Sequence, residues 1–385
     1  MRVLVAMSGG VDSSVAAALM VEAYGQDQVV GATLKLWGGS SDSGCCSVAD
    51  VDDARRVADR LGIAHHVFNF SSEFTEHVVD PYVSGHAEGL TPNPCIECNR
   101  HLKFDRLMVR ATQLGFDAVA TGHHARRATD PDGRHRLLRG ADPAKDQSYV
   151  LAMLGQDQLA RCLFPIGGMI KDEVRAEASR LGLRTAQKPD SQDVCFIRSD
   201  VGRGGFLADR IELHPGRLVD HETGDDLGAV EAVELVTVGQ RRGMGHGQDG
   251  RRRFVTRVDV PARRVWVGPP EANRVHVLHL HTLAWTAEVP GGGAGPFAGA
   301  GPWPVLVQVS AHGKELNGTV AVTSARDDGG VEEVLVTLDE PQRLIAAGQT
   351  VALYDPDRPD SVVGSGIVAT SSEDHEDQAG PVGAR

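Results

Sequence analysis

Three cysteines stand at positions where thiol chemistry would be expected. Cys95 and Cys98 are spaced as CxxC in TPNPCIECNRHLKF (residues 91–104), and Cys195 lies much later, in KPDSQDVCFI (residues 188–197). Thiolates are nucleophiles and metal ligands, and nearby positive charge favours them over thiols. The basic neighbours that would supply this charge are Arg100, His101 and Lys103. Prolines on both sides of Asn93 predict that the first two cysteines lie on a rigid loop outside regular structure.

These thiols are compatible with more than one kind of site. A structural zinc site needs four ligands, yet the sequence has one CxxC and no second pair at ribbon or finger spacing. Cys195, followed by Phe196 and Ile197, also fits a buried structural thiol. In a sulfur relay, one thiol of the Cys98 and Cys195 pair would carry a persulfide. The other thiol would attack its inner sulfur and leave a transient disulfide.

A second group of residues could hold a phosphate. VAMSGGVDSSVAAALM (residues 5–20) places two glycines between a strand-like and a helix-like run. Glycines let backbone amides approach an anion, and we expect Ser13 or Ser14 to cap the helix that follows. The segment lacks the GxxxxGK[ST] and GxGxxG patterns, which disfavours a P-loop ATPase and a Rossmann dehydrogenase. The alternative is an ordinary strand-turn-helix with Asp12 as a cap.

The elements around these residues predict an α/β domain with a parallel sheet. Apolar strand-like runs alternate with amphipathic helix-like runs in the first half of the chain. Helices are expected over residues 52–62 and 171–182, because apolar side chains recur there at helical spacing and each run ends on glycine. Strands are expected over residues 2–7, 29–37, 64–70 and 116–125.

The second half of the chain has a different pattern. Short alternating segments separated by Gly, Pro and Asp predict an antiparallel β-barrel near the C-terminus. A glycine-rich stretch, residues 290–302, is expected to be a flexible surface loop whose only packing residue is Phe297. We expect an α/β domain over residues 1–204, a small central domain over 205–271, a barrel over 272–370 and an acidic disordered tail over 371–385.

Composition narrows the class of protein. Of the 385 residues 41% are hydrophobic, and the apolar runs are too short to span a membrane, so we expect a cytoplasmic protein without a membrane partner. Six cysteines are too few for a disulfide scaffold in a chain of this length. The net charge of −13 argues against indiscriminate nucleic-acid binding but permits a local basic groove. Basic residues that could line such a groove are Arg100, Lys103, Arg106, Arg126, Arg127, Arg203, Arg241, Arg242 and Arg251 to Arg253.

The string SGGVDSS (residues 8–14) resembles the pyrophosphatase loop, or PP-loop, of enzymes that cleave ATP between the α and β phosphates and adenylate a substrate oxygen. Further blocks, in this order, are similar to the bacterial tRNA-specific 2-thiouridylase family, which installs 2-thiouridine at the wobble position. They are TPNPCIECNRHLKF, ATGHHAR, KDQSYVL, PIGGMIKDEVR, KPDSQDVCFI and TVGQRRGMGH, and they cover most of residues 1–250. The resemblance implies an adenine nucleotide hydrolase-like α/β domain, a small central domain and a C-terminal β-barrel.

The resemblance also implies residue roles. Cys98 falls on the family's nucleophile and Cys195 on the cysteine that carries the persulfide and forms the transient disulfide. Asp12 is an expected catalytic residue within the ATP loop. The positions expected to contact ATP are Ala6, Met7, Ser8, Gly9, Gly10, Val11, Asp12, Ser13, Leu34 and Gly122. Those expected to contact tRNA are Lys145, Asp146 and Gln147, with Asn93, Pro94 and Cys95 facing the target base.

One position departs from the family. Many members carry Asp where this sequence has Cys95, and that carboxylate is a proposed base. An alternative is a [4Fe–4S] cluster on Cys95, Cys98 and Cys195, whose open iron would bind sulfide, because thiolates are the usual cluster ligands. The expected cofactors are therefore ATP with Mg²⁺ and, in this alternative, the cluster.

The expected reaction has two stages. ATP activates the uridine C2 oxygen as an adenylate and releases pyrophosphate, and sulfur from Cys195 then displaces AMP. The expected partners are tRNA, with Lys, Glu and Gln acceptors from the resemblance, and a cysteine desulfurase or a sulfur-relay protein. The rival hypotheses are a small-molecule ligase that uses the same adenylation and a non-catalytic RNA- or zinc-binding adaptor.

Overall fold

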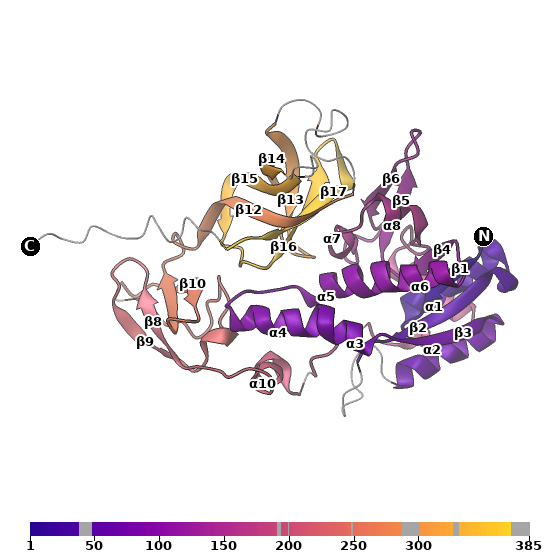
Figure 1. Ribbon diagram of the computed structural model, residues 1–385, viewed down its shortest axis with the longest axis horizontal. Helices are drawn as coiled ribbons and strands as arrows, with labels where there is room; N and C mark the ends of the chain where they lie inside the picture. Colours follow the sequence, from indigo (N-terminus) through magenta and orange to yellow (C-terminus); the bar gives the residue numbers. More distant parts are fainter. Residues whose placement is uncertain are drawn as a thin grey trace, which may run out of the picture.

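The computed structural model of the chain describes residues 1–37, 48–190, 194–198, 200–247, 249–286, 297, 301–325 and 331–370. Figure 1 shows an α/β domain at the N-terminus, a small β-rich domain in the middle of the chain and a β-barrel near the C-terminus. The tail expected over residues 371–385 lies outside the described residues. Within the described part of the chain, no helix combines the length and apolar character needed to cross a membrane.

The first domain is built on a parallel sheet whose described strands lie in the order β3-β2-β1-β4-β7. Alternate residues of the central strand β1 face opposite sides, with Val3 and Val5 in one apolar cluster and Leu4 in another. Burial on both faces explains the continuous apolar run in the sequence. The strands are β1 (Val3–Ala6), β2 (Val29–Lys35), β3 (Ala64–Asn69), β4 (Ala118–Thr121) and β7 (Cys162–Leu163).

Helices cover both faces of this sheet. One apolar cluster contains residues of α1 (Val11–Tyr24), α2 (Val48–Leu61) and α9 (Lys171–Arg180). The other contains residues of a second group of helical elements and of the segment around Phe196. This second group comprises α3 (Ser71–Phe74), the π-helical η2 (Thr75–Val79), α4 (Asp80–Ala87), α5 (Pro94–Glu97), the π-helical η3 (Cys98–Arg106) and α6 (Leu107–Gln113). The helices and strands expected in the first half are thus confirmed, and the phosphate loop lies where β1 meets α1.

The central domain has its own small sheet, in the order β10-β11-β8-β9. Its core is aliphatic and includes Leu218, Val255, Val265 and Val267. Its strands are β8 (Gly216–Asp220), β9 (Asp226–Val230), β10 (Phe254–Asp259) and β11 (Arg264–Gly268), and α10 (Gly202–Ala208), which precedes them, packs on the apolar cluster of the first domain.

The C-terminal strands form the expected antiparallel barrel. β12 pairs with β15 on one side and with β17 on the other. The second pairing closes the ring β12-β15-β14-β13-β16-β17, so the barrel has no free strand edge among these strands. Phe297 is fully buried and packs edge-on against Trp285 and Trp303, as expected for the packing residue of its glycine-rich stretch. The strands are β12 (Arg274–Trp285), β13 (Trp303–Gln308), β14 (Leu316–Ala325), β15 (Val331–Arg343), β16 (Thr350–Asp355) and β17 (Arg358–Val368).

A hairpin of the first domain extends the barrel sheet, which the sequence patterns did not predict. β5 (Ala125–Thr129) and β6 (His135–Arg139) pair with each other, and β6 pairs with β17 through Leu137 and Val362 (Figure 1). Leu137 and Val362 belong to the same apolar cluster as the helices of the first domain. The hairpin therefore joins the barrel to the α/β domain through one continuous core.

The shared core predicts that Leu137→Ala destabilises the protein by about 2–5 kcal/mol, because a fully buried side chain would leave a cavity at the junction. Leu138→Ala on the same strand is the matched control, since Leu138 is only partly buried and should cost less. Urea unfolding followed by tryptophan fluorescence measures both. Equal losses in the two variants would contradict a shared core at Leu137.

Candidate active site

The phosphate loop leaves the N-terminus of α1 open. Gly10 is the N-cap, and no side chain among the described residues caps this helix. The expectation that Ser13 or Ser14 caps it is wrong, because both hydroxyls instead donate to the Gly10 carbonyl oxygen, at 3.2 and 2.7 Å. The Ser13 hydroxyl also accepts from the Ser8 amide at 3.1 Å and so holds the loop closed on itself. An uncapped helix N-terminus with its positive dipole is suited to bind an anion.

Two glycines shape this loop by close approach. Gly9 has a φ of +73°, and a Cβ there would clash with the backbone of Asp50 at the start of α2. Gly122, just after β4, comes so near α1 that a Cβ would lie 2.6 Å from the Ser13 nitrogen. The structure thus brings Gly122 against the SGGVDSS loop. Leu34, also expected at the ATP site, is buried on the adjacent strand β2.

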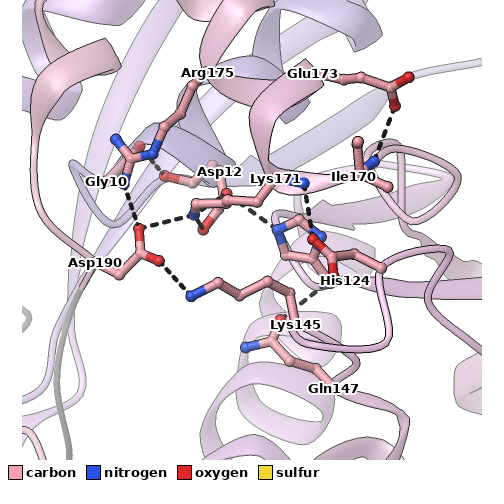
Figure 2. Close-up of polar contacts among 12 residues, drawn as sticks. Gly10, Asp12, His124, Lys145, Gln147, Ile170, Lys171, Glu173, Arg175 and Asp190 are labelled. Atoms are coloured by element: carbon pink, nitrogen blue, oxygen red, sulfur yellow. Dashed lines mark hydrogen bonds and ion pairs between the residues drawn. The ribbon is translucent and has the colours of Figure 1, made fainter.

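Asp12, in the first turn of α1, is held by two basic side chains (Figure 2). Lys171 donates to both of its carboxylate oxygens, at 2.7 and 2.8 Å, and His124 Nε2 lies 3.2 Å from one of them. Burial would raise the pKa of Asp12, but the hydrogen bonds from His124 and Lys171 outweigh burial and lower it. Asp12 is therefore ionised at neutral pH, and its carboxylate is bound by Lys171 and His124.

Asp190 extends the network beyond Asp12. Its carboxylate binds Lys145 at 2.8 Å, Lys171 at 2.9 Å and Arg175 at 2.8 Å (Figure 2). Burial would raise the pKa of Asp190, but the hydrogen bonds from Lys145 and Lys171 bring it down to about 2. Sequence reasoning missed Lys171 and Asp190 as site residues. Both lie in the blocks PIGGMIKDEVR and KPDSQDVCFI, but no spacing rule connects residues so far apart in the chain.

The two cysteines of the CxxC lie at the start of a helix and not on a loop as expected. Asn93 is the N-cap of α5, and its side-chain oxygen accepts from the Cys95 and Ile96 amides at 3.1 and 3.4 Å. Pro94 occupies the first helical position, where its missing N–H costs nothing and its fixed φ suits the helix. Proline here starts the helix instead of preventing it. Cys95 is exposed, whereas Cys98, which begins η3, is buried.

Cys98 and Cys195 contribute to one apolar cluster. Cys98 is 7% exposed within it, and the partly buried Cys195 packs against it. The neighbouring Phe196 fixes this placement through edge-on or tilted contacts with Phe74 and Phe206, with ring centroids 5.6 and 5.1 Å apart. The structure therefore places two cysteines that lie far apart in the chain on the same apolar cluster.

The basic side chains near Cys98 supply less positive charge than expected. Arg100 and His101 both lie 3.3 Å from the Glu97 carboxylate, which offsets the guanidinium charge. Burial lowers the pKa of His101 despite Glu97, so this ring is neutral at pH 7. His101 therefore does not contribute to stabilising a Cys98 thiolate.

The four described cysteines do not gather into a metal-binding group. Among the residues that the structure describes, no three His, Cys, Asp or Glu side chains gather closely enough to hold a metal ion. Cys95 is exposed while Cys98 is buried in the apolar cluster, so the expected Cys95, Cys98 and Cys195 ligand set does not fit a [4Fe–4S] cluster. The same observation argues against a zinc site on the CxxC. Any Mg²⁺ would be held chiefly by ATP phosphates and water, which is common for this ion.

The block expected to contact tRNA is tied to the ATP site. Gln147 exchanges hydrogen bonds with the His124 backbone, accepting from its amide at 2.9 Å and donating its own amide to the His124 carbonyl oxygen at 2.9 Å. Asp146 is 8% exposed, and its carboxylate accepts from the amides of Gly140 and Ser148 at 2.9 and 3.0 Å. The Asp146 side chain thus shapes the loop from inside, while Lys145 and Gln147 are partly exposed.

Several arginines expected to line a basic groove have structural partners. Arg253 is buried between Asp220 and Asp249, and Arg203 donates to the Leu235 carbonyl oxygen at 2.7 Å. Arg126 pairs with Asp360, Arg127 donates to carbonyl oxygens of α8 (Gln156–Arg161), and Arg251 pairs with Glu271. The basic residues that remain exposed include Arg106, Arg241, Arg242 and Arg252.

Comparisons with known proteins agree with this arrangement. Three family models match in chain order: tRNA methyl transferase HUP domain over residues 1–199, tRNA methyl transferase PRC-barrel domain over 204–269 and Aminomethyltransferase beta-barrel domain over 275–368. Among solved structures, the glutamine-dependent NAD+ synthetase of Acinetobacter baumannii is 17% identical, with a TM-score of 0.34 over 55% of this chain and 37% of that chain. That similarity is too low to support an argument.

The relatives matched by sequence are much more similar. The chain is 48% identical to the tRNA-specific 2-thiouridylase MnmA of Mycobacterium leprae, over 97% of this chain and 100% of the relative. It is 43% identical to the protein of the same name from Renibacterium salmoninarum, over 96% and 97%, and 44% identical to that from Beutenbergia cavernae, over 97% and 96%. Because these relatives match along almost their whole length, the chain belongs to the tRNA-specific 2-thiouridylase family.

Proposed function

We propose that this chain is a tRNA-uridine 2-sulfurtransferase, which uses ATP to replace the C2 oxygen of the wobble uridine with sulfur. We further propose that the protein acts in the cytoplasm. The observation that carries this proposal is the set of ion pairs that links the phosphate loop to Asp190, in the same sequence block as Cys195. The Asp190 carboxylate pairs directly with Lys171, which is also the partner of Asp12. Beyond Asp190 in the chain comes Cys195, which packs on the cluster that contains Cys98.

The adenylation step uses the phosphate loop. The uridine C2 oxygen attacks the α-phosphorus of ATP, the bond between the α and β phosphates breaks, and pyrophosphate leaves. The open N-terminus of α1 and the cations of Lys145, Lys171 and Arg175 lie where they can offset phosphate charge, which is the main way proteins promote phosphoryl transfer. Gly9 and Gly122 let the backbone of α2 and of α1 approach closely, which shapes the loop that would hold the nucleotide. Mg²⁺ would supply further charge neutralisation on the phosphates.

The sulfur step uses the two cysteines. The terminal sulfur of a persulfide on Cys195 attacks C2 of the adenylated uridine, and AMP leaves with the former C2 oxygen. The Cys98 thiolate then attacks the inner sulfur of Cys195, which releases the 2-thiouridine and leaves a Cys98 to Cys195 disulfide for an external thiol to reduce. Their shared cluster supports this pairing, and the exposure of Cys95 places a thiol toward solvent at the helix start, where the target base is expected.

The remaining roles concern tRNA and the sulfur source. We assign tRNA contact to Lys145 and Gln147, with Asp146 holding their loop in shape, and to the exposed Arg241 and Arg242 of the central domain. An anticodon base can be splayed out of its loop, which makes its C2 position accessible. A cysteine desulfurase or a sulfur-relay protein supplies the persulfide sulfur. The acceptors are tRNAs for Lys, Glu and Gln.

Cysteine variants test the sulfur step. With ATP, Mg²⁺, cysteine and a desulfurase, Cys98→Ser and Cys195→Ser are expected to abolish 2-thiouridine in wobble-uridine tRNA, because each removes one thiol of the relay. Cys95→Ser is expected to retain it, as is the control Cys162→Ala, which changes a fully buried thiol on β7. Nucleoside mass spectrometry measures the product.

Two results would count against this function. Absence of 2-thiouridine with the unaltered protein would contradict tRNA thiolation. ATP cleavage to AMP that depends on a small acid and not on tRNA would favour the small-molecule ligase instead.

The close approach at Gly122 gives a test of the ATP site. Gly122→Ala is expected to weaken ATP binding roughly tenfold to a hundredfold, because the added Cβ would push against the Ser13 nitrogen and displace the helix N-terminus. Gly168→Ala is the matched control, since a Cβ there meets no atom within 4 Å. Isothermal titration calorimetry with ATP and Mg²⁺ measures both variants. Equal ATP affinities in the two variants would show that Gly122 does not contribute to the ATP site.

A further inference from the structure

A turn of the C-terminal barrel binds the chain just before α5, the helix that carries the first cysteine of the CxxC. The Thr91 amide donates to the Ala347 carbonyl oxygen at 2.9 Å, and the Gln349 side-chain amide donates to the Thr91 carbonyl oxygen at 2.9 Å. Both backbone polar groups of Thr91 are therefore bound by one turn, residues 346–349, which leads into β16 (Figure 1). This barrel turn joins the barrel to the α/β domain at a second place, apart from the β5–β6 hairpin.

The barrel turn is closely fitted to the segment that it binds. The Gln349 amide donates back to the Ala346 carbonyl oxygen at 3.1 Å, and Gly348 between them has a φ of +85°. A Cβ at Gly348 would lie 3.2 Å from the Thr91 nitrogen, so the two segments are in close contact. The Gly348 amide also donates to the Val368 carbonyl oxygen at 2.9 Å, which attaches the turn to β17. The turn is therefore a fixed part of the barrel.

The chain between Thr91 and the first cysteine is short and stiff. Proline fixes its own φ and restricts the residue before it to extended backbone, so Pro92 and Pro94 restrict every residue from Thr91 onward. Asn93 is extended, with φ −101° and ψ 98°, and its side-chain oxygen accepts from the Cys95 amide at 3.1 Å. Because few dihedral angles are free here, the position of Thr91 sets the position of Asn93 and Cys95.

The same end of the barrel also reaches the far side of the CxxC. Tyr149 of α7 (Ser148–Leu151) is 2% exposed, and its hydroxyl donates to the carbonyl oxygen of Thr350, the first residue of β16, at 2.8 Å. The next residue, Val150, accepts from the side chain of Asn99 at 3.0 Å. Asn99 directly follows the second cysteine and is 3% exposed. The start of β16 is therefore connected to residues on both sides of the CxxC.

We propose that the barrel turn positions α5 for the reaction, with Gln349 as the positioning residue that binds the chain before the helix. This inference rests on the proposed function, in which the start of α5 faces the target uridine. Through the Thr91 backbone, the turn holds Cys95 and the residues before it in one place while C2 is adenylated and sulfur is transferred. Loss of the Gln349 hydrogen bond weakens this attachment and leaves the Thr91 contact to Ala347.

Hydrogen exchange tests the placement without relying on activity. Peptides that cover residues 91–97 are followed by mass spectrometry in the unaltered protein and in Gln349→Ala. The variant is expected to exchange about fivefold faster in this segment, because a hydrogen bond that opposes local opening is lost. Gln349→Glu keeps the size of the side chain but removes the donor, so it is expected to exchange as Gln349→Ala does. Exchange at the rate of the unaltered protein in either variant would overturn the proposal.

The matched control for these variants is Gln342→Ala. Gln342 also belongs to the barrel, on β15, and its side-chain amide donates to the Glu340 carbonyl oxygen of the same strand at 3.4 Å. This variant is expected to leave the exchange of residues 91–97 unchanged. A similar increase in Gln342→Ala and Gln349→Ala would contradict a specific role of Gln349.

A second pair of variants tests the turn if Gln349→Ala does not fold. Gly348→Ala is expected to push the turn away from Thr91 and to raise the exchange of residues 91–97, because the added Cβ has too little room. Gly224→Ala places alanine at a similar left-handed φ, +73°, where a Cβ meets no atom within 4 Å. The control therefore carries the backbone strain without the contact. Equal exchange of residues 91–97 in the two variants would overturn the proposal.

Single-turnover thiolation then connects the placement to the reaction. At saturating tRNA, Gln349→Ala is expected to form 2-thiouridine about tenfold more slowly, because a small displacement of reacting groups is enough to slow a reaction. Its ATP affinity is expected to equal that of the unaltered protein, since the phosphate loop lies where β1 meets α1. Gln349→Lys retains a donor and is expected to recover part of the rate. An unaltered rate in Gln349→Ala, or a parallel loss of ATP affinity, would overturn the role of Gln349.

The two measurements separate this inference from the proposed function. Failure of the unaltered protein to make any 2-thiouridine would contradict the proposed function. The exchange of residues 91–97 would still decide whether Gln349 positions α5.

Discussion

The ion pairs of Lys171 are the constraint on which the rest of the site depends. A nearly buried ammonium must be paired, and Lys171 satisfies this need with Asp12 at the start of α1 and Asp190 beyond the end of α9. Lys171 is also the first residue of α9, where the helix dipole disfavours a cation. Its amide donates to Asp142 at 3.0 Å, which places a third carboxylate nearby. One side chain therefore links the phosphate loop, a helix that covers the sheet and Asp190.

A second set of contacts ties the barrel to this site. Arg139, on the hairpin strand β6, pairs with Asp146 at 3.0 Å and with Glu315 of the barrel domain at 2.8 Å, and it stacks over the Tyr354 ring. Asp146 shapes the loop that carries Lys145 and Gln147, so the barrel helps to position residues that reach the ATP site. The barrel thus contributes to the site through packing and not through a cysteine or phosphate ligand.

The arrangement also separates the competing hypotheses by chemistry. A small-molecule ligase with the same loop would have no use for two cysteines on one apolar cluster, and a zinc-binding adaptor would need ligands that the described residues do not gather. Several arginines, including Arg253 and Arg126, form ion pairs with carboxylates of the same chain. The acidic total charge is nevertheless compatible with RNA binding, because a local basic surface is enough. Screening over about 8 Å at physiological salt makes such local charge more important than the total.

The sequence by itself determined features that depend on neighbouring residues. The sequence predicts the alternation of strands and helices, the glycine loop and the antiparallel barrel. It does so because the spacing of apolar residues and the backbone preferences of each residue are local properties. The loop expected around Pro94 is in fact the start of a helix. Proline suits both a loop and a helix start, and only the Asn93 cap distinguishes them. The tertiary structure alone decided the pairing of β6 with β17, the convergence of Lys145, Lys171 and Arg175 on Asp190, and the shared cluster of Cys98 and Cys195. These contacts join residues far apart in the chain, and their geometry depends on how the sheets and helices pack, which no local pattern encodes.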